Sequence, residues 1–269
     1  MKIHQIKIDF NVTETVRRFV YVYLIEAAHC WLIDSGVCGA ERQIAGYMNA
    51  IGRDISDIKG IFLTHAHPDH IGTAAWFREQ TGCSVYASEG EKPWIEDIDL
   101  QFRERPIPNF YSLAGKPVQV DVTVSDGDAF ELEPGLVIHA VGTAGHSVDG
   151  MSYRLADALF IGDAVPVKGD IPIFVDEQRT RETLARLEKL TDVKVFYPAW
   201  DVTYDRLTMQ RKIREARELI DVLQKAVITC DDGGTAQALA KKVSAFLGMP
   251  MLTDNPLFAR TLACLRERG

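Results

Sequence analysis

The sequence lacks the features of a secreted, disulfide-rich or membrane-spanning chain. Its five cysteines, Cys30, Cys38, Cys83, Cys230 and Cys264, are an odd number and include no C-x-x-C pair. It has no run of about 18 apolar residues, the length needed to cross a bilayer. Its first ten residues carry charges every few positions and hold no apolar stretch of the signal-peptide kind. We therefore expect reduced thiols, a cytoplasmic location and no contact with a membrane.

The chain also lacks an excess of positive charge. Lys and Arg total 30 against 38 for Asp and Glu, which gives a formal net charge of -8. Repulsion from phosphates then disfavours nucleic acid as a partner. With 46% hydrophobic and 25% charged residues over 269 positions, the composition is that of a globular protein. We expect a small-molecule substrate as the partner, with a homo-oligomer left open.

Strand-like and helix-like patterns are mixed over the first three quarters of the chain. Strands are predicted at 18–26, 30–34, 58–64, 84–88, 118–124, 136–143, 152–155, 158–162 and 194–198. Helices are predicted at 41–52, 71–82 and 178–190. Because strands follow one another in pairs as well as alternating with helices, a mixed sheet or two sheets with helices outside fits best. The fold class is therefore α/β (α+β).

The pattern changes after Tyr204. Three helical patterns with no strand between them follow, at 206–228, 234–247 and 255–267. We therefore divide the chain into a domain of residues 1–205 and a C-terminal helical appendage of residues 206–269. Residues 95–117 show no clear period and contain three prolines, so they are predicted to be a long, functional loop.

The chemistry concentrates in the segment T-H-A-H-P-D-H, which ends a predicted buried strand. Within six residues it places His65, His67, Asp69 and His70. An irregular loop can point several imidazoles and a carboxylate into one small volume, as a borderline-soft divalent metal requires. An H-x-H-x-D-H pattern arises by chance in roughly 4 in 10,000 chains of this composition. A solvated turn would leave this pattern unexplained, so we predict a metal site.

Two further ligand-type residues follow predicted strands. His146 lies in G-T-A-G-H-S, after the apolar run LVIHAV, and Asp163 lies in F-I-G-D-A. Sites on layered sheets commonly form where strands lead into loops. Taken alone, a histidine in this position is more often a packing residue, and a Gly-Asp pair is more often a turn. The prediction that both residues bind metal therefore relies on the presence of the first motif. His4, His29 and His139 have no such context and are predicted to be structural.

Together these segments resemble the metallo-β-lactamase-fold superfamily. The matching elements are LIDSG at 32–36, THAHPDH at 64–70, TAGHS at 143–147 and GDA at 162–164, in the family's order. The resemblance implies a four-layer αβ/βα sandwich with its site at one edge, between the two sheets.

The resemblance also implies a role for each ligand-type side chain. One metal would be held by three histidines, a second by an Asp–His pair, and both by a bridging aspartate: His65, His67 and His146; Asp69 and His70; Asp163. Asp34 would support the ligand loop without binding metal. A bridging hydroxide would attack the substrate, and Asp69 would help pass a proton to the leaving group. This implies a hydrolase of an ester, thioester or lactone with two Zn²⁺ ions, or with Fe or Mn in their place.

One expected ligand is missing. The family pattern ends its metal set with a histidine after the last strand, whereas this chain reads Y-P-A-W-D from Tyr197 to Asp201, and no histidine follows His146. Trp200 cannot ligate a metal, because the indole nitrogen is only a donor. Asp201 either supplies an oxygen ligand or merely caps the turn. A carboxylate there would favour Mn or Fe over Zn, or leave the second site weakly filled.

A substrate pocket is expected beside the metals. Trp200 and Tyr197 are candidates to contact the substrate, near the last strand. In the segment 95–117, Arg103, Arg105, Phe110 and Tyr111 would complete a pocket for an apolar body with an anionic handle.

Two other classes of function remain open. One is a redox enzyme, either a mononuclear iron dioxygenase acting on a persulfide or a di-iron oxygen-reducing module. The other is a non-catalytic metal-binding protein, although structural zinc sites are usually closed sets of four Cys or His ligands.

Overall fold

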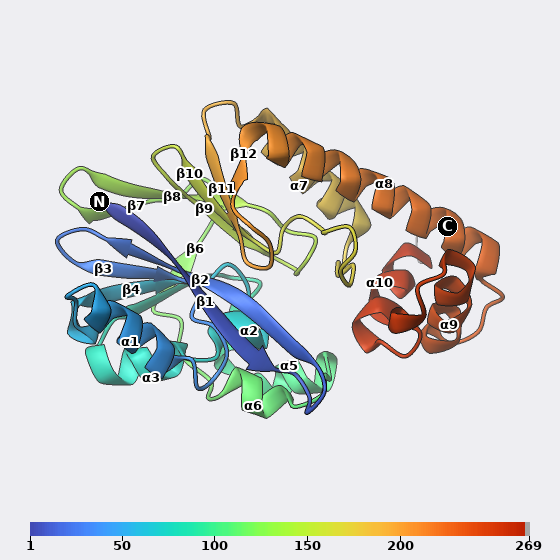
Figure 1. Ribbon diagram of the computed structural model, residues 1–269, viewed down its shortest axis with the longest axis horizontal. Helices are drawn as coiled ribbons and strands as arrows, with labels where there is room; N and C mark the ends of the chain where they lie inside the picture. The colour runs from blue at the N-terminus through green and yellow to red at the C-terminus, as the bar shows by residue number, and fades with distance from the viewer. Residues whose placement is uncertain (267–269) are drawn as a thin grey trace.

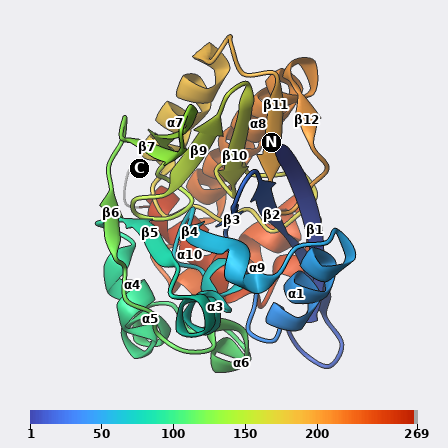
Figure 2. The same cartoon turned by 90° about the vertical axis from the view of Figure 1, so that its left-hand side faces the viewer.

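The computed structural model describes residues 1–266, which form two facing sheets with helices outside both (Figure 1). Figure 2 shows α1 (Glu41–Ala50) and α3 (Ala74–Thr81) on the opposite side of the molecule from α7 (Glu177–Lys189). This is the four-layer α/β sandwich that the resemblance implies. None of the described helices combines the length and the apolar character needed to cross a membrane.

The first sheet has six strands in chain order. The strands are β1 (Lys2–Asn11), β2 (Arg17–Glu26), β3 (Cys30–Ile33), β4 (Ile58–Phe62), β5 (Ser84–Ser88) and β6 (Val122–Val124). β1, β2 and β3 pair antiparallel, whereas β3, β4, β5 and β6 are parallel to one another. The carboxyl ends of β3 and β4 therefore lie at the same edge of the sheet, and their loops meet there.

The second sheet also has six strands in chain order. They are β7 (Ala129–Glu133), β8 (Leu136–Gly142), β9 (Met151–Leu155), β10 (Ala158–Gly162), β11 (Val195–Pro198) and β12 (Tyr204–Asp205). β10 and β11 pair parallel, and the other neighbours pair antiparallel. The loops that follow β8 and β10 carry His146 and Asp163.

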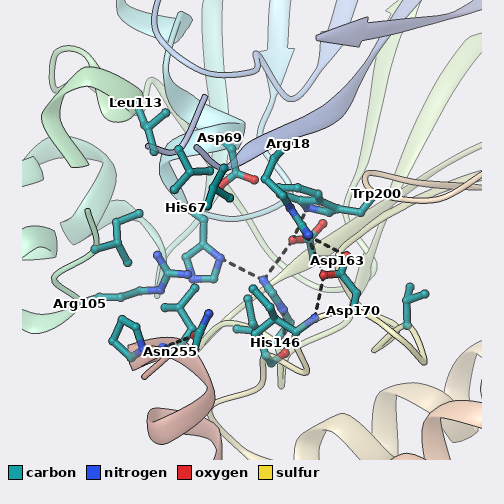
Figure 3. A pocket seen from close by; sticks show the side chains of 18 of the residues that line it. Arg18, His67, Asp69, Arg105, Leu113, His146, Asp163, Asp170, Trp200 and Asn255 are labelled. Atoms are coloured by element: carbon teal, nitrogen blue, oxygen red, sulfur yellow. Dashed lines mark hydrogen bonds and ion pairs between the residues drawn. The ribbon is translucent and has the colours of Figure 1, made fainter. Parts of the chain in front are cut away.

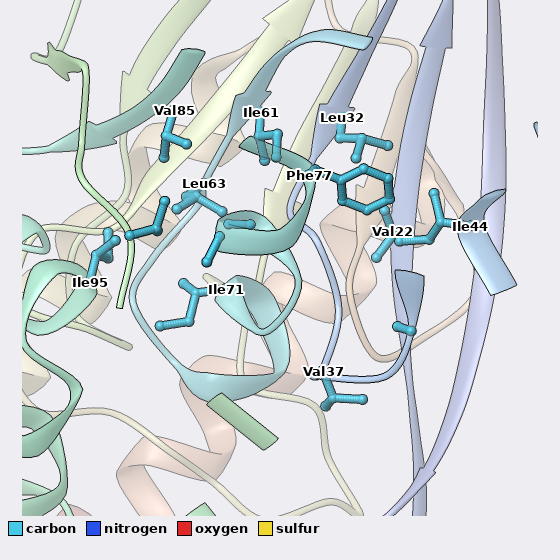
Figure 4. Close-up of a cluster of buried hydrophobic side chains, with 14 of the residues drawn as sticks. Val22, Leu32, Val37, Ile44, Ile61, Leu63, Ile71, Phe77, Val85 and Ile95 are labelled. Atoms are coloured by element: carbon cyan, nitrogen blue, oxygen red, sulfur yellow. The ribbon is translucent and has the colours of Figure 1, made fainter. Parts of the chain in front are cut away.

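Three apolar layers hold the sandwich together. The alternation along β2 shows how, since Val22 and Leu24 face the helices while Tyr23 and Ile25 face the second sheet. Figure 4 shows the outer layer of the first sheet, where Val22 lies near Phe77 of α3. The third layer joins the second sheet to the helices that follow it.

The C-terminal helices are α8 (Arg206–Cys230), α9 (Ala236–Leu247) and α10 (Pro256–Arg266), close to the predicted bounds, although residue 267 lies outside the described residues. The side chain of Asp205 caps α8 by accepting a hydrogen bond from the Thr208 N–H at 2.7 Å. Ile213 of α8 belongs to the same buried cluster as Leu159 of β10. The C-terminal helices thus share a core with the second sheet, and the division at residue 205 stays a prediction.

The prediction of a long loop at 95–117 is wrong. The segment contains the end of α4 (Lys92–Glu96) and two further short helices, α5 (Ile98–Glu104) and α6 (Phe110–Ala114). They escape detection because each is too short to show a period, and packing on the first core stabilises them instead. The predicted strand 118–124 is likewise reduced to Val122–Val124.

Three strands were not predicted at all: β1, β7 and β12. β1 is an edge strand with charges on its exposed face, and only Ile6 and Ile8 are fully buried along it. A further short helix, α2 (Pro68–Ile71), begins inside the His-rich motif and precedes α3. The predicted helix 71–82 therefore corresponds to α3, and only its first residue belongs to α2.

Packing of α8 on the second sheet can be tested by cavity creation. Ile213 is fully buried, whereas Leu207 on the same helix is 76% exposed. Ile213→Ala should destabilise the protein by about 2–5 kcal/mol in urea unfolding, because it leaves a cavity in the shared core. Leu207→Ala, the control, should stay within about 0.5 kcal/mol of the parent. Equal effects of the two variants would show that α8 does not contribute to that core.

Candidate metal centre

The His-rich loop is fixed to the end of β3 by the Asp34 carboxylate. Its Oδ1 accepts the Thr64 N–H at 2.7 Å, and its Oδ2 accepts the Thr64 hydroxyl at 2.9 Å. The same Oδ2 lies 2.8 Å from His70 Nδ1. Asp34 is 2% exposed and has a positive φ of 58°. Asp34 therefore holds both ends of the ligand loop.

Three imidazoles and one carboxylate converge above this loop. His65 Nε2 and His146 Nε2 lie 2.9 and 3.0 Å from His67 Nδ1. Asp163 Oδ2 lies 3.3 Å from His146 Nε2 and 3.9 Å from His65 Nε2. Zinc–nitrogen bonds of about 2.0–2.1 Å place tetrahedral ligands about 3.3 Å apart. The spacing and the donor types of this first cluster fit a divalent metal.

Asp163 also completes a second cluster with Asp69 and His70. His70 Nε2 lies 3.3 Å from Asp69 Oδ2 and 3.5 Å from Asp163 Oδ2. Three buried atoms here have no hydrogen-bond partner within residues 1–266: Asp69 Oδ2, His70 Nε2 and Asp163 Oδ1. Buried polar atoms are rarely left unpaired, so this arrangement is suited to a bound cation.

In two of the histidines, a hydrogen-bond partner on one ring nitrogen determines that the other nitrogen faces the clusters. His146 Nδ1 lies 2.9 Å from the Ile173 carbonyl, and His65 Nδ1 lies 3.0 Å from the Thr64 hydroxyl. These contacts leave Nε2 of both rings directed at the first cluster. Metal-binding histidines are oriented in this way by a partner on the other nitrogen.

Burial keeps the three imidazoles of the first cluster neutral. It lowers the pKa of His65 and of His67 well below the ordinary value, and neighbouring cationic groups lower both further. Burial also lowers the pKa of His146. Neutral imidazoles present free lone pairs at neutral pH, which is the form that binds metal.

His70 differs from these three. Burial opposes its protonation, but the carboxylates of Asp34, Asp163 and Asp69 together raise its pKa well above the ordinary value. Burial likewise opposes the ionisation of Asp69, while the neighbouring His70 holds the pKa of that carboxyl below its usual range. In the metal-free chain, a proton on His70 thus balances part of the charge of the three carboxylates.

The two halves of the protein meet closely at this site. Gly162 has a φ of +49°, and a Cβ there would lie 2.7 Å from the Thr64 hydroxyl oxygen. Only glycine allows this approach, which brings the neighbouring Asp163 to the His-rich loop. The glycine in the G-D-A segment is therefore part of the site.

The structure places Asp201 outside both clusters. Its Oδ1 accepts the Val202 N–H at 2.8 Å, and its Oδ2 accepts the Tyr204 hydroxyl at 2.7 Å and the Lys212 ammonium at 2.6 Å. Neither described cluster includes it. Of the two alternatives left open for Asp201, the structure supports the turn residue and corrects the ligand, because the carboxylate is held by the turn and by α8.

Trp200 instead points into the site. Its Nε1 donates a hydrogen bond to Asp163 Oδ2 at 2.9 Å, the oxygen shared by both clusters. The indole lines the adjoining cavity, as expected (Figure 3). Tyr197 does not line it, because its ring stacks on Phe160 at 5.1 Å and contacts Tyr23 between the sheets. Tyr197 is therefore a packing residue.

Residues missed by the sequence analysis also hold the ligand loop. Glu91 accepts the Ala66 N–H at 2.9 Å, and Gln101 donates to the Ala66 carbonyl at 2.6 Å. Burial raises the pKa of Glu91. Glu91 precedes α4 and Gln101 lies in α5, and both helices are too short to show a periodic pattern. No signal in the sequence therefore identifies these two residues.

A cavity of about 320 Å³ opens beside the two clusters. His67, Asp69, His146 and Asp163 line one end of it, and mostly apolar side chains line the rest. Of the four residues expected from segment 95–117, Arg105 alone lines it. Arg103 and Tyr111 are exposed, and Phe110 is buried in the first core. The predicted structural histidines His4, His29 and His139 also lie outside the clusters.

Comparison with known proteins identifies the family. A family model described as the metallo-beta-lactamase superfamily matches residues 15–200. A probable polyketide biosynthesis zinc-dependent hydrolase, BaeB of Bacillus velezensis, is 32% identical over 42% of this chain and 41% of its own length. A hydroxyacylglutathione hydrolase of Hyphomonas neptunium is 26% identical over 69% of this chain and 65% of its own length. The match thus spans less than two thirds of each relative.

Among solved structures, a metallo-beta-lactamase family protein of Thermus thermophilus shares the fold. It aligns with a TM-score of 0.75 and 20% identity, over 99% of this chain and 94% of its own. The chain belongs to the metallo-beta-lactamase superfamily, as its motifs predict.

His146 tests the first cluster, since it lies far from the His-rich loop in sequence. His146→Ala should weaken zinc binding to chelator-stripped protein by more than about 100-fold, because it removes one of four donors rather than an outer partner. His139→Ala, on the exposed face of β8, should bind zinc like the parent. Unchanged affinity in His146→Ala would remove His146 from the ligand set.

Asp201 tests the correction made above. Asp201→Ala should leave the number and affinity of bound zinc ions unchanged, because its carboxylate faces Lys212 and Tyr204. The free energy of unfolding should fall by about 1–3 kcal/mol, because the buried part of this hydrogen-bond network is left unpaired. Zinc titration and urea unfolding separate the two effects. Loss of one zinc equivalent would restore Asp201 as a ligand.

Proposed function

We propose that the protein is a metal-dependent hydrolase of an ester, thioester or lactone. The observation that carries this proposal is the convergence of six ligand-type side chains at the end of an apolar cavity. Structural metal sites are closed by their ligands, whereas catalytic sites keep an open position for water and substrate. Relatives named as a zinc-dependent hydrolase and as hydroxyacylglutathione hydrolases support the same class.

In this proposal the first metal would be held by His65, His67, His146 and Asp163, and the second by Asp69, His70 and Asp163. A divalent ion held by these residues would supply Lewis-acid chemistry toward the carbonyl group and the attacking water. Asp69 lines the cavity, and its lowered pKa keeps it ionised at neutral pH. It accepts the proton that the attacking water loses and returns it to the departing oxygen or sulfur.

The first metal position should bind more tightly than the second. Four donor atoms of the protein surround the first position, whereas three surround the second, and one of these three is shared. The shared Asp163 Oδ2 already accepts the Trp200 N–H. We therefore propose that zinc fills the first position before the second, with Fe or Mn as the alternatives that metal analysis would reveal.

The apolar cavity favours a small organic substrate over a macromolecule. We propose that this substrate is met in the cytoplasm, since the five cysteines are an odd number with no C-x-x-C pair. We also propose that it is not a nucleic acid, since the net charge of -8 disfavours one. A homo-oligomer is compatible with this proposal.

Hydrolysis of p-nitrophenyl esters, thioesters and lactones tests the function. Activity should disappear with chelator, return with zinc, and rise with pH through one ionisation near neutrality, because the attacking water must lose a proton. Asp69→Asn should lower kcat by about 100-fold or more, since it removes both the proton acceptor and a ligand of the second metal position. A rate that is insensitive to chelator would contradict the mechanism. Iron with a visible absorption band in the purified protein would favour the redox alternative.

A further inference from the structure

The cavity beside the metal centre has a long apolar wall. Phe10 and Val12 come from the first hairpin, Ile107 precedes α6, Leu113 lies in α6, Val167 follows β10, and Leu257 lies in the first turn of α10. These residues come from both halves of the protein and from the C-terminal helices. A ligand with an extended apolar body would bury its surface against them.

Two arginines also line the cavity, Arg18 and Arg105. Of these two, only Arg18 forms an ion pair with a carboxylate among the described residues. Arg18 donates to both oxygens of Asp170, at 2.8 and 2.7 Å, and its guanidinium lies over the Trp200 ring at 4.5 Å. The charge of Arg18 is therefore neutralised by a carboxylate of the protein itself. Arg105 makes no ion pair with any carboxylate of residues 1–266.

Arg105 is buried without a partner for its side chain in the part of the chain that the structure describes. It follows α5, is 5% exposed, and its Nη1 has no hydrogen-bond partner. Figure 3 shows the side chain reaching across the cavity toward His67. Burial lowers its pKa to about 10, with Asp69 and Asp163 opposing the shift and Arg260 adding to it, so it remains charged at neutral pH. A buried, unpaired guanidinium is costly for stability alone.

The geometry points to a role for this charge in binding. We propose that Arg105 binds an anionic group of the substrate, a carboxylate, while the substrate's apolar body lies along the cavity wall. A guanidinium has a planar array of donors that matches a carboxylate in a bidentate pair. The substrate class is then a carboxylate-bearing ester or thioester with an apolar chain. This inference rests on the proposed hydrolysis for its substrate, but not for its binding site.

Binding of octanoate and 1-octanol to the metal-loaded full chain separates Arg105 from the reaction, because neither molecule is hydrolysed. Calorimetry should show that Arg105→Met weakens octanoate binding by about 10- to 100-fold, the range for a hydrogen bond to a charged group. Binding of 1-octanol should not change, since only the carboxylate contacts Arg105. Arg103→Met, on the exposed face of α5, is the control and should bind both molecules like the parent.

Arg105→Lys keeps the charge but loses the planar donor array, so it should lose part of the octanoate affinity. Arg105→Lys also replaces Arg105→Met as the test variant if Arg105→Met does not fold. Equal octanoate affinity in the parent and in either Arg105 variant would overturn the inference, as would failure of the parent to bind octanoate. Arg105-dependent octanoate binding without any ester hydrolysis would instead refute the proposed function and leave the binding site standing.

If the proposed hydrolysis and the Arg105 binding site are both correct, the parent enzyme should have a lower KM for p-nitrophenyl hydrogen suberate than for p-nitrophenyl octanoate. The two esters differ only in the carboxylate that replaces a terminal methyl group. Arg105→Met should raise KM for the suberate ester by about 10-fold or more, with kcat and the octanoate ester little affected. A fall in kcat for both esters would contradict a binding role.

Discussion

The site depends on one buried carboxylate, that of Asp34. It binds the backbone and hydroxyl of Thr64 and the ring of His70, and so fixes both ends of the ligand loop to the end of β3. Four ligand-type side chains in a free loop would prefer water to burial. With the loop held by Asp34, their directions are set before any metal binds, which reduces the entropy lost on binding.

Thr64 extends this constraint to the second half of the protein. Its carbonyl accepts the Met151 N–H at 2.8 Å, and the Tyr153 hydroxyl donates to the neighbouring Leu63 carbonyl at 2.9 Å. The close contact of Gly162 with its hydroxyl adds a third link. The loops that carry His146 and Asp163 are thereby placed against the His-rich loop, so each sheet supplies part of one metal centre.

Local patterns in the sequence were sufficient for the strongest features. The H-x-H-x-D-H motif predicts a cluster because its ligands are neighbours in the chain. His146 and Asp163 could be predicted as ligands only because that motif is present in the same chain. Arg105 and Asp201 show where such reasoning ends. Arg105 lies in a segment of short helices that only packing stabilises, and the role of Asp201 depends on Lys212, a residue of the following helix. Partners of this kind are set by the tertiary structure, and no local period encodes them.

Anomalous X-ray scattering at the zinc edge, from crystals grown with zinc, tests the central claim most directly. The account predicts a strong peak among the ring nitrogens of His65, His67 and His146 and the carboxylate of Asp163, with any weaker second peak beside His70. A peak at another place, or none in a crystal whose protein is shown to bind zinc, would contradict the assignment of this cluster as the metal centre.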